Sequence, residues 1–218
     1  MKLYISGIRE IECLKGVELL TESRRARIDR YVRFEDKARC LIAGLLLRRV
    51  CGVTDDFQLT YGAKGKPYLK DGGAFFSISH SGDYVVLATS DSEVGVDIEK
   101  VANYSDSVAA RCFTPQELKW MRSSSCRDTF HRLWTAKESI MKGTGLGFSL
   151  PPEAFSVIPE DSSAIFADDR YWSLDWLSYD GYIICRAEEC NVYAELPRSG
   201  KATALSPCFI TCEKLLYQ

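Results

Sequence analysis

The segment Gly95-Val96-Asp97-Ile98-Glu99 is followed about forty residues later by the segment Trp134-Thr135-Ala136-Lys137-Glu138-Ser139-Ile140-Met141-Lys142. The first alternates apolar and acidic residues, which predicts a strand, and the second has the spacing of an amphipathic helix. Together they supply three carboxylates and two lysines. Carboxylates suit a hard divalent cation and lysines suit phosphate, so the pair predicts a site for a Mg²⁺-bound pyrophosphate.

The strand has one apolar and one acidic face. Because side chains alternate along a strand, its apolar residues share the face that we expect in the core: Val94, Val96 and Ile98. Asp97 and Glu99 share the other face with Gly95, which adds no bulk beside them. Taken alone, the segment is more typical of a half-exposed strand whose acidic face is solvated, as in many antiparallel sheets.

The helix, predicted over 127–142, carries charge inside its apolar stripe. At 100° per residue the stripe consists of Phe130, Leu133, Trp134, Ile140 and Met141. Lys137 falls in the middle of this stripe, Glu138 at its edge, and Lys142 one turn beyond Glu138. A charge in a core-facing stripe is costly unless it has a partner. The alternative is that Lys137 snorkels to solvent and that Glu138 and Lys142 form a surface pair.

Composition and charge narrow the class of protein. The 218 residues are 46% hydrophobic and 27% charged, which is typical of a globular protein with a real core. A net charge of −2 gives no drive toward nucleic acid or anionic membrane, and no stretch approaches the roughly 20 apolar residues of a membrane span. Nine scattered cysteines without a C-x-x-C pair are expected to be reduced thiols. We therefore expect a cytoplasmic protein that binds neither nucleic acid nor membrane.

The order of predicted elements suggests a degenerate twofold repeat. In the first half, helices over 22–33 and 35–51 precede strands over 57–61, 75–79, 84–89 and 94–100. In the second, helices over 108–112, 114–121 and 127–142 precede strands over 154–158, 171–178, 182–186 and 204–210. Thr114, Pro115 and Glu117 form the signature of a helix N-terminus. Each half thus has a capped helix, a longer helix and then strands.

Two further groups could bind an anion. The first is a basic run within sixteen positions: Arg24, Arg25, Arg27, Arg30, Arg33, Lys37 and Arg39. It is either a solvated helix face or a cradle for phosphate. The second is His80, which is either a phosphate contact or a structural imidazole. Ser79 and His80 cannot easily act as a nucleophile pair, because neighbouring residues on a strand point in opposite directions.

With these residues in view, the chain resembles the 4′-phosphopantetheinyl transferases, specifically the monomeric type that activates surfactin-like peptide synthetases. The resemblance rests on four segments in the same order and spacing: 65–67 (Gly-Lys-Pro), 77–81, 95–99 and 134–142. It covers most of the chain, roughly to Ile158. Two departures concern detail: Ser77 stands where asparagine is frequent, and Arg24 and Arg27 stand where lysines are found in the best-known members.

The resemblance implies an α+β fold of two similar halves related by pseudo-twofold symmetry, with the active site at their interface. We expect these halves to span 1–102 and 103–218. It also implies transfer of the 4′-phosphopantetheine moiety of coenzyme A to a serine of an apo acyl, peptidyl or polyketide carrier protein, with release of adenosine 3′,5′-bisphosphate. The alternative is a catalytically inactive, coenzyme-A-binding regulatory protein, which should lack a metal ligand or a phosphate lysine.

By matching positions, the resemblance implies a role for each site residue. The metal ligands for Mg²⁺, with Mn²⁺ as a substitute, are Asp97, Glu99 and Glu138. Glu138, Lys137 and Lys142 are the catalytic residues, with both lysines on the pyrophosphate. The other residues that would bind coenzyme A are Arg24, Arg27, Arg39, Gly65, Lys66, Pro67, Ser79 and His80. Glu138 is the candidate base for the serine hydroxyl, although a carboxylate bound to Mg²⁺ is a weaker base.

Overall fold

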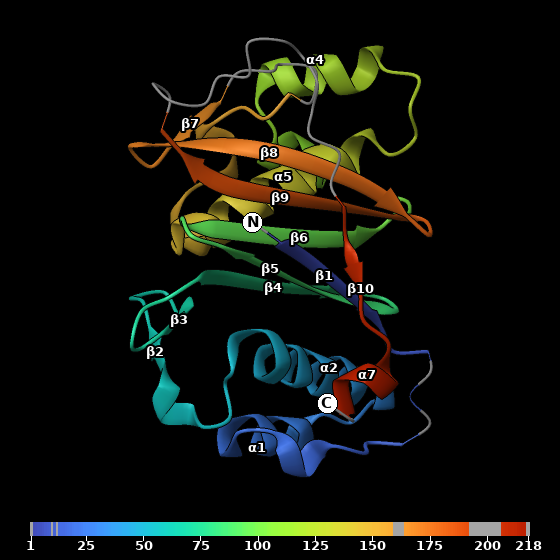
Figure 1. The fold of residues 1–218 in the computed structure, drawn as a ribbon. Helices are drawn as coiled ribbons and strands as arrows, with labels where there is room; N and C mark the ends of the chain where they lie inside the picture. The colour runs from blue at the N-terminus through green and yellow to red at the C-terminus, as the bar shows by residue number, and fades with distance from the viewer. Residues whose placement is uncertain (1, 10, 12, 159–163, 192–205, 217–218) are drawn as a thin grey trace.

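The computed structural model describes residues 2–9, 11, 13–158, 164–191 and 206–216. Two sheets pack face to face, and each carries a long helix on its outer face (Figure 1). All strand pairs are antiparallel except β1 with β10, which is parallel. Helix α2 covers the N-terminal sheet and helix α5 covers the C-terminal sheet. Among the described residues, no helix is both long and apolar enough to cross a membrane.

The N-terminal half has a four-stranded sheet in the order β10-β1-β5-β4. Its elements are β1 (Lys2–Gly7), α1 (Glu22–Arg30), α2 (Phe34–Cys51), β2 (Leu59–Tyr61), β3 (Pro67–Leu69), β4 (Phe75–Ser81) and β5 (Tyr84–Ser90), joined late in the chain by β10 (Cys208–Phe209) and α7 (Cys212–Leu216). Alternation along β5 explains the packing. Val85 and Leu87 face α2, whereas Val86 and Ala88 face the other sheet. Strands β2 and β3 form a separate hairpin.

The C-terminal half has a sheet in the order β6-β9-β8-β7. Its elements are β6 (Val94–Lys100), α3 (Asp106–Cys112), α4 (Pro115–Ser123), α5 (Thr129–Thr144), β7 (Ile165–Ala167), β8 (Arg170–Tyr179) and β9 (Tyr182–Cys190). Trp172 and Cys185 pack against α5 on one face of this sheet. On the other face Val96, Ile98 and Ile184 pack against the N-terminal sheet.

The two halves repeat one topology, which confirms the predicted repeat. Three strands of each half correspond: β1, β4 and β5 in the first, and β6, β8 and β9 in the second. In chain order, the third strand lies in the middle, between the first and the second, which gives β1-β5-β4 and β6-β9-β8, and all of these pairs are antiparallel. The predicted boundary at residue 102 is wrong, however. Strand β6 pairs along its whole length with β9, so the second half begins at the turn between β5 and β6.

Most predicted elements are present, and one is wrong. The predicted capping box forms at Thr114, whose hydroxyl accepts from the backbone of Glu117. No strand forms over 154–158: a short 3-10 helix occupies Pro152–Ala154, and the carbonyl of Phe155 and the amide of Val157 bond to buried charged side chains instead of to a strand. Of the strand predicted over 204–210, residues 204 and 205 lie outside the described residues, and the described part is β10.

Candidate active site

Strand β4 separates two sites, because its alternate side chains point to opposite faces. Its even-numbered residues line a cavity beside α2: Phe76, Ile78 and His80. Three of its odd-numbered residues form a serine row that contacts β6: Ser77, Ser79 and Ser81. Ser77 Oγ accepts from the amide of Val96 at 3.1 Å, and Ser81 Oγ accepts from the amide of Lys100 at 3.2 Å. The row joins the two halves along the acidic strand.

Helix α5 lies directly against the backbone of β6 at Gly95. A Cβ at this position would be 1.8 Å from the carbonyl oxygen of Ser139 and 2.5 Å from the amide nitrogen of Gly143. Both neighbours are backbone atoms, so a larger residue would push the helix away from the strand. This contact places Glu138 and Lys142 of the helix beside the carboxylates of the strand. The sequence predicted only that Gly95 adds no bulk, and the structure gives it this positive role.

Asp97 is the most buried of the three carboxylates, at 3% exposure. Its Oδ1 accepts from Ser79 Oγ at 2.8 Å and pairs with Lys142 Nζ at 2.6 Å. Its Oδ2 is buried and has no hydrogen-bond partner among the residues that the structure describes. The solvated acidic face considered for this strand is therefore wrong at Asp97. A buried carboxylate oxygen without a partner is costly, and a ligand would satisfy it.

The other two carboxylates are held near Asp97. Glu99 accepts from Ser81 Oγ at 3.0 Å. Burial, reinforced by the charge of Asp97, raises the pKa of Glu99 above its usual range. Burial also raises the pKa of Glu138; the charge of Lys142 opposes this shift, and the charges of Asp97 and Glu99 add to it. The charged forms of Glu99 and Glu138 are therefore disfavoured beside Asp97, and a cation bound here would stabilise them.

The donor chemistry fits Mg²⁺, although the ligands are not yet gathered. Carboxylate oxygens are the ligands of this hard cation, and Asp97 Oδ2 is available. Among the described residues, no three His, Cys, Asp or Glu side chains converge as a ready-made metal site. Instead, the ammonium group of Lys142 pairs with Asp97 Oδ1.

Lys137 and Lys142 lie in different places, although the resemblance implied one role for both. Lys142 Nζ bonds to Asp97 and, at 2.9 Å, to Ser79 Oγ. Lys137 is fully buried in the C-terminal half, where its Nζ lies 2.9 Å from Glu117 Oε1. It also donates to the carbonyls of Pro152 and Phe155, both at 2.6 Å.

The structure therefore corrects the implied pyrophosphate contact of Lys137. Its charge is neutralised by Glu117, which is itself fully buried and accepts from the amides of Thr114 and Val157. All of these partners lie within the C-terminal half, on α4 and in the segment after α5. Lys137 thus holds that half together and does not reach the carboxylates of β6.

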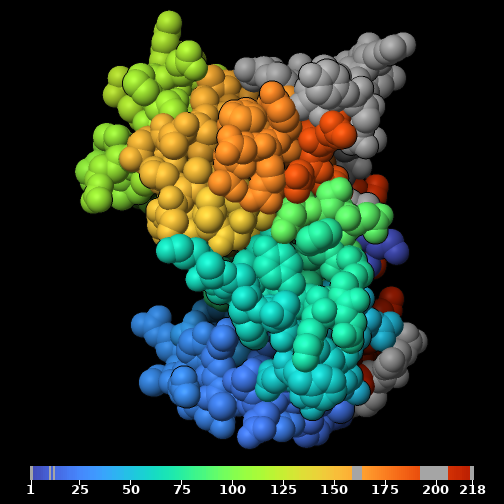
Figure 2. Space-filling view, turned by 90° about the vertical axis from the view of Figure 1, so that its left-hand side faces the viewer, coloured from blue at the N-terminus to red at the C-terminus, as the bar shows by residue number. Residues whose placement is uncertain are grey.

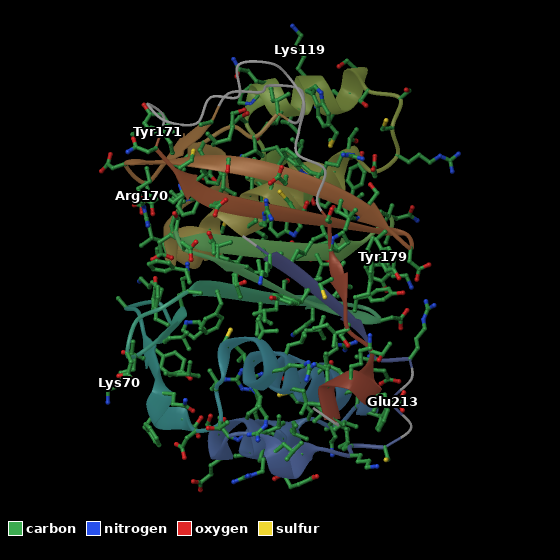
Figure 3. The ribbon with its side chains drawn as sticks, viewed as in Figure 1. Lys70, Lys119, Arg170, Tyr171, Tyr179 and Glu213 are labelled. Carbon is green, nitrogen blue, oxygen red and sulfur yellow. The ribbon has the colours of Figure 1, made fainter. Side chains whose placement is uncertain are left out.

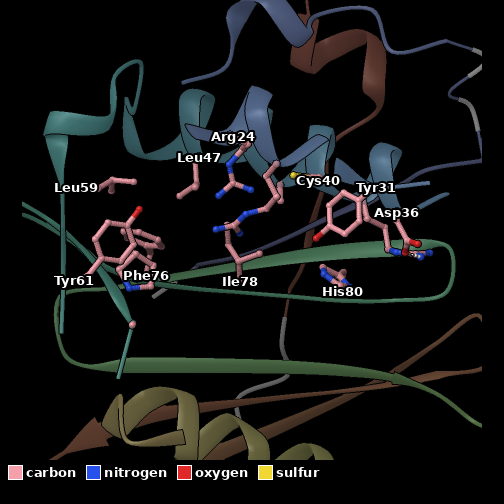
Figure 4. Close-up of a pocket in the computed structure, with 15 residues that line it drawn as sticks. Arg24, Tyr31, Asp36, Cys40, Leu47, Leu59, Tyr61, Phe76, Ile78 and His80 are labelled. Carbon is pink, nitrogen blue, oxygen red and sulfur yellow. Dashed lines mark hydrogen bonds and ion pairs between the residues drawn. The ribbon is translucent and has the colours of Figure 1, made fainter. Parts of the chain in front are cut away.

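The other face of β4 borders a cavity of about 270 Å³ beneath α2 (Figure 4). It contains six of the residues implied to bind coenzyme A: Arg24, Arg27, Arg39, Gly65, Pro67 and His80. Tyr31 and Tyr61 also line it, and neither was predicted. The three guanidinium groups and the histidine make the cavity suitable for an anion such as phosphate.

The basic groups of the cavity are held by different contacts. Arg39 pairs with Asp36 at 2.5 Å and donates to the carbonyl of Gly82 at 2.7 Å. Burial lowers the pKa of Arg24 and of His80, and for His80 the nearby charges of Arg39 and Lys142 add to the effect. A bound phosphate would oppose these shifts, because an opposite charge stabilises the protonated form.

Two residues implied to bind the nucleotide lie elsewhere. Ser79 faces Asp97 and Lys142, on the opposite side of β4 from His80. Lys66 does not line the cavity, although both of its neighbours do. Its Nζ instead reaches Glu93 at 2.5 Å and the carbonyl of Gly143 at 2.6 Å. The assignment of both residues to the nucleotide therefore needs correction.

Sequence reasoning also missed Glu117 and Arg170. Glu117 was recognised only as part of a capping box, but Oε1 of the same carboxylate pairs with Lys137. The signal was the uncompensated charge of Lys137 within an apolar stripe. Arg170, in β8, donates to the carbonyl of Thr144 at the end of α5 at 3.3 Å. No local pattern marks this contact, because the two residues belong to elements far apart in the chain.

Comparisons with known proteins agree with this geometry. Residues 93–187 match the family model described as the 4′-phosphopantetheinyl transferase superfamily, and residues 10–92 match the model described as 4′-phosphopantetheinyl transferase, N-terminal. The two models meet at the turn between β5 and β6, where the structure divides the halves.

Individual relatives cover most of the chain. A 4′-phosphopantetheinyl transferase of Bacillus subtilis is 33% identical over 155 residues, which are 67% of this chain and 69% of the relative. Sfp of Bacillus subtilis strain 168 is 33% identical over 150 residues, 65% of this chain and 67% of the relative. An L-aminoadipate-semialdehyde dehydrogenase-phosphopantetheinyl transferase of Xenopus laevis is 32% identical over 177 residues, 69% of this chain and 58% of the relative. The chain therefore belongs to the 4′-phosphopantetheinyl transferase superfamily.

Proposed function

We propose that the seam between β4, β6 and α5 is the transfer site of this 4′-phosphopantetheinyl transferase. The enzyme transfers the 4′-phosphopantetheine moiety of coenzyme A to a serine of an apo carrier protein. The observation that carries the assignment is the division made by β4. Carboxylates and Lys142 lie on one side of the strand, and an arginine-lined cavity lies on the other. Coenzyme A has a pyrophosphate for the first and a 3′-phosphorylated nucleotide for the second.

Asp97, Glu99 and Glu138 would hold Mg²⁺, for which Mn²⁺ is expected to substitute. When bound, the cation neutralises pyrophosphate charge and orients the phosphorus for in-line attack. The unpartnered Oδ2 of Asp97 and the chemistry of the donor set support this placement. Lys142 would then donate to a phosphate oxygen, for which its present position between Asp97 and Ser79 prepares it.

The transfer exchanges one phosphorus–oxygen bond for another. The carrier's serine oxygen bonds to the phosphorus that bears pantetheine, and the bond from that phosphorus to the bridging oxygen breaks. Adenosine 3′,5′-bisphosphate leaves, and the serine proton passes to the carboxylate of Glu138. Glu138 suits this role because it lies on α5 one turn before Lys142, while Asp97 and Glu99 already supply two carboxylates from the strand.

The cavity beneath α2 would take the nucleotide. Arg24, Arg27, Arg39 and His80 would surround the 3′-phosphate, and Gly65 and Pro67 would lie near the adenine; all six line the cavity. An inactive coenzyme-A-binding protein should lack one of the chemical groups, but the three carboxylates and Lys142 are all present at the seam.

We further propose that the enzyme acts as a monomer in the cytoplasm, with neither nucleic acid nor membrane as a partner. One chain supplies both halves of the site, which supports a monomer. No disulfide joins any of the nine cysteines, all of which lie in the part of the chain that the structure describes. This fits a reducing compartment.

The test is Glu138→Gln, which keeps the shape and a ligand oxygen but removes basicity. Holo-carrier formation from coenzyme A is measured against Mg²⁺ concentration, with the exposed Glu35→Gln as the matched control. If Glu138 is the base, saturating Mg²⁺ leaves a deficit of roughly 10²- to 10⁴-fold. Full recovery at high Mg²⁺ would leave Glu138 as a metal ligand alone. Tight binding of coenzyme A without holo-carrier formation by the wild type would favour the regulatory alternative.

A further inference from the structure

Lys66 lies between the two proposed sites. Its neighbours Gly65 and Pro67 line the nucleotide cavity, as do Leu59 and Tyr61 across the hairpin. The Lys66 side chain points away from the cavity and is buried, with 9% of the residue exposed. A loop that forms the wall of one site therefore sends its central side chain toward the other.

The Lys66 ammonium group bonds to both elements that carry the proposed transfer residues. It donates to the carbonyl of Val94, the first residue of β6, at 3.1 Å, and to the carbonyl of Gly143 in α5 at 2.6 Å. Gly143 directly follows Lys142. Glu93, at 2.5 Å, balances the charge. Lys66 belongs to the N-terminal half and thus links two elements of the C-terminal half, the start of β6 and the end of α5.

A second cation reaches the same end of α5. Arg170 donates to the carbonyl of Thr144, one residue beyond the carbonyl that Lys66 bonds. Figure 3 shows Arg170 on the same side of the molecule as the β2–β3 hairpin. Positive groups are favourable at a helix C-terminus. The two cations differ in origin, because Arg170 belongs to the same half as α5, whereas Lys66 belongs to the hairpin of the nucleotide cavity.

The β2–β3 hairpin packs closely against the C-terminal end of α5. Gly145 ends the helix with φ +73°, and a Cβ there would lie 3.3 Å from Lys66 Cδ and 3.3 Å from the Tyr68 hydroxyl oxygen. Figure 2 shows the teal surface that includes the hairpin against the yellow surface that includes the end of α5. The same helix is in direct backbone contact with β6 at Gly95. A shift of the hairpin therefore reaches the helix and strand through direct contacts.

We propose that Lys66 is a positioning residue that couples occupancy of the nucleotide cavity to the geometry of Lys142, Glu138 and the carboxylates of β6. This inference rests on the proposed function of the two sites. A nucleotide that fixes the hairpin also fixes α5 against β6, so each ligand strengthens the binding of the other. Coupling of this kind is reciprocal, which allows it to be measured from either site.

The experiment measures Mn²⁺ affinity with and without adenosine 3′-phosphate, a probe that lacks the 5′-phosphate and so cannot ligate the metal through it. The variants are Lys66→Met and Arg170→Met, with the exposed Lys64→Met as the control from the same loop. We expect adenosine 3′-phosphate to tighten Mn²⁺ binding in the wild type, in Lys64→Met and in Arg170→Met, but not in Lys66→Met. Lys66→Met should also lower kcat for holo-carrier formation by about 2- to 30-fold. Its affinity for adenosine 3′-phosphate should change by less than about 3-fold, because the loss is of coupling energy and not of a direct contact.

Three results would overturn the proposal. Adenosine 3′-phosphate binding weakened tenfold or more by Lys66→Met would make Lys66 a nucleotide contact. Equal loss of coupling in Arg170→Met would reduce the effect to general stabilisation of the helix end. Unchanged coupling in Lys66→Met would remove Lys66 from the path. If Lys66→Met fails to fold, because it leaves Glu93 without its cation, Lys66→Met/Glu93→Gln answers the same question.

Failure of the proposed function has a different signature. A wild-type protein that couples Mn²⁺ to adenosine 3′-phosphate but forms no holo-carrier would refute the transferase assignment and leave the coupling intact. A wild type that forms holo-carrier without any coupling would refute the role of Lys66 and leave the transferase intact.

Discussion

Lys137 and Lys142 are five residues apart on one helix, and they do unrelated work. Five steps of 100° place them about 140° apart around the axis. Lys142, with 31% of its side chain exposed, points to the seam between the halves and meets Asp97. Lys137, with no exposure, points into the C-terminal core and meets Glu117. Helix α5 therefore presents its chemistry on one face and anchors itself by a buried ion pair on another.

A charged residue can thus lie within a sequence motif without belonging to the site that the motif marks. A buried ion pair is retained at a cost of desolvation, so both partners depend on each other. Lys137 holds the segment after α5 through two backbone carbonyls, and Glu117 holds the same segment through the amide of Val157. The buried contacts of Lys137 and Glu117 thus help to fix the position of α5, the helix that carries Glu138 and Lys142.

The largest expected effect comes from breaking the buried pair. Lys137→Met leaves Glu117 without its cation in the core, which should lower the free energy of unfolding by about 3–5 kcal/mol. Urea denaturation measures it, with Lys119→Met on the surface of α4 as the control. The folded fraction should keep its kcat. Loss of kcat with unchanged stability would instead return Lys137 to the pyrophosphate and erase the contrast with Lys142.

Lys142→Met should have the opposite pattern. Removing one charged donor from a transfer site typically lowers kcat by about 10²- to 10³-fold. The loss of stability should be smaller than for Lys137→Met, because the Lys142 side chain is partly exposed. Holo-carrier assays and urea denaturation are run on the same preparations. Near-normal turnover in Lys142→Met would show that the ammonium group beside Asp97 is only structural.

The two faces of β4 allow the same comparison with neighbouring residues. His80→Ala should weaken binding of coenzyme A more than of dephospho-coenzyme A, by about 1.5–3 kcal/mol, the worth of a hydrogen bond to a charged group. Ser79→Ala, on the opposite face, should weaken both ligands equally. Calorimetric titration with the two ligands measures the preference. If His80→Ala also affects both equally, His80 does not contact the 3′-phosphate.

The smallest effect is a pH dependence at the other end of α5. His131 Nε2 accepts from the amide of Ala102, and burial lowers the pKa of His131 below 6.5. The unfolded chain therefore binds the proton more readily. This contribution to stability should be complete above about pH 6.5 and should decline as the pH falls below it. His131→Gln should flatten that part of the stability profile between pH 5 and 7. An unchanged profile would mean that other groups cause the decline.

The sequence predicted the structure correctly where the local periodicity of apolar and polar residues determines it. Alternation placed Val96 and Asp97 on opposite faces of β6, and the capping box at Thr114 formed as predicted. The helical period also put Lys137 inside an apolar stripe and required a partner for it. The resemblance then led to a pyrophosphate role for Lys137, and the period proved the better guide.

Long-range contacts could not be predicted in this way. The partners of Lys66 lie 27 and 77 positions away, at Glu93 and Gly143. The boundary at 102 was wrong for the same reason, because only the pairing of β6 with β9 assigns that strand to the second half. Pairing of distant segments depends on the packed fold, and local patterns carry no information about it.

The serine row has a consequence for the solubility of the separate halves. Strand β6 is an edge strand, and a free edge is a template for adding a strand from another molecule. The hydroxyl groups of Ser77 and Ser81 in β4 accept hydrogen bonds from the amides of Val96 and Lys100 on this edge. A C-terminal fragment made alone would expose both those amides and the apolar face that normally packs on the first sheet. We expect such a fragment to aggregate, and the two halves produced together to rescue each other by reassembling along β4.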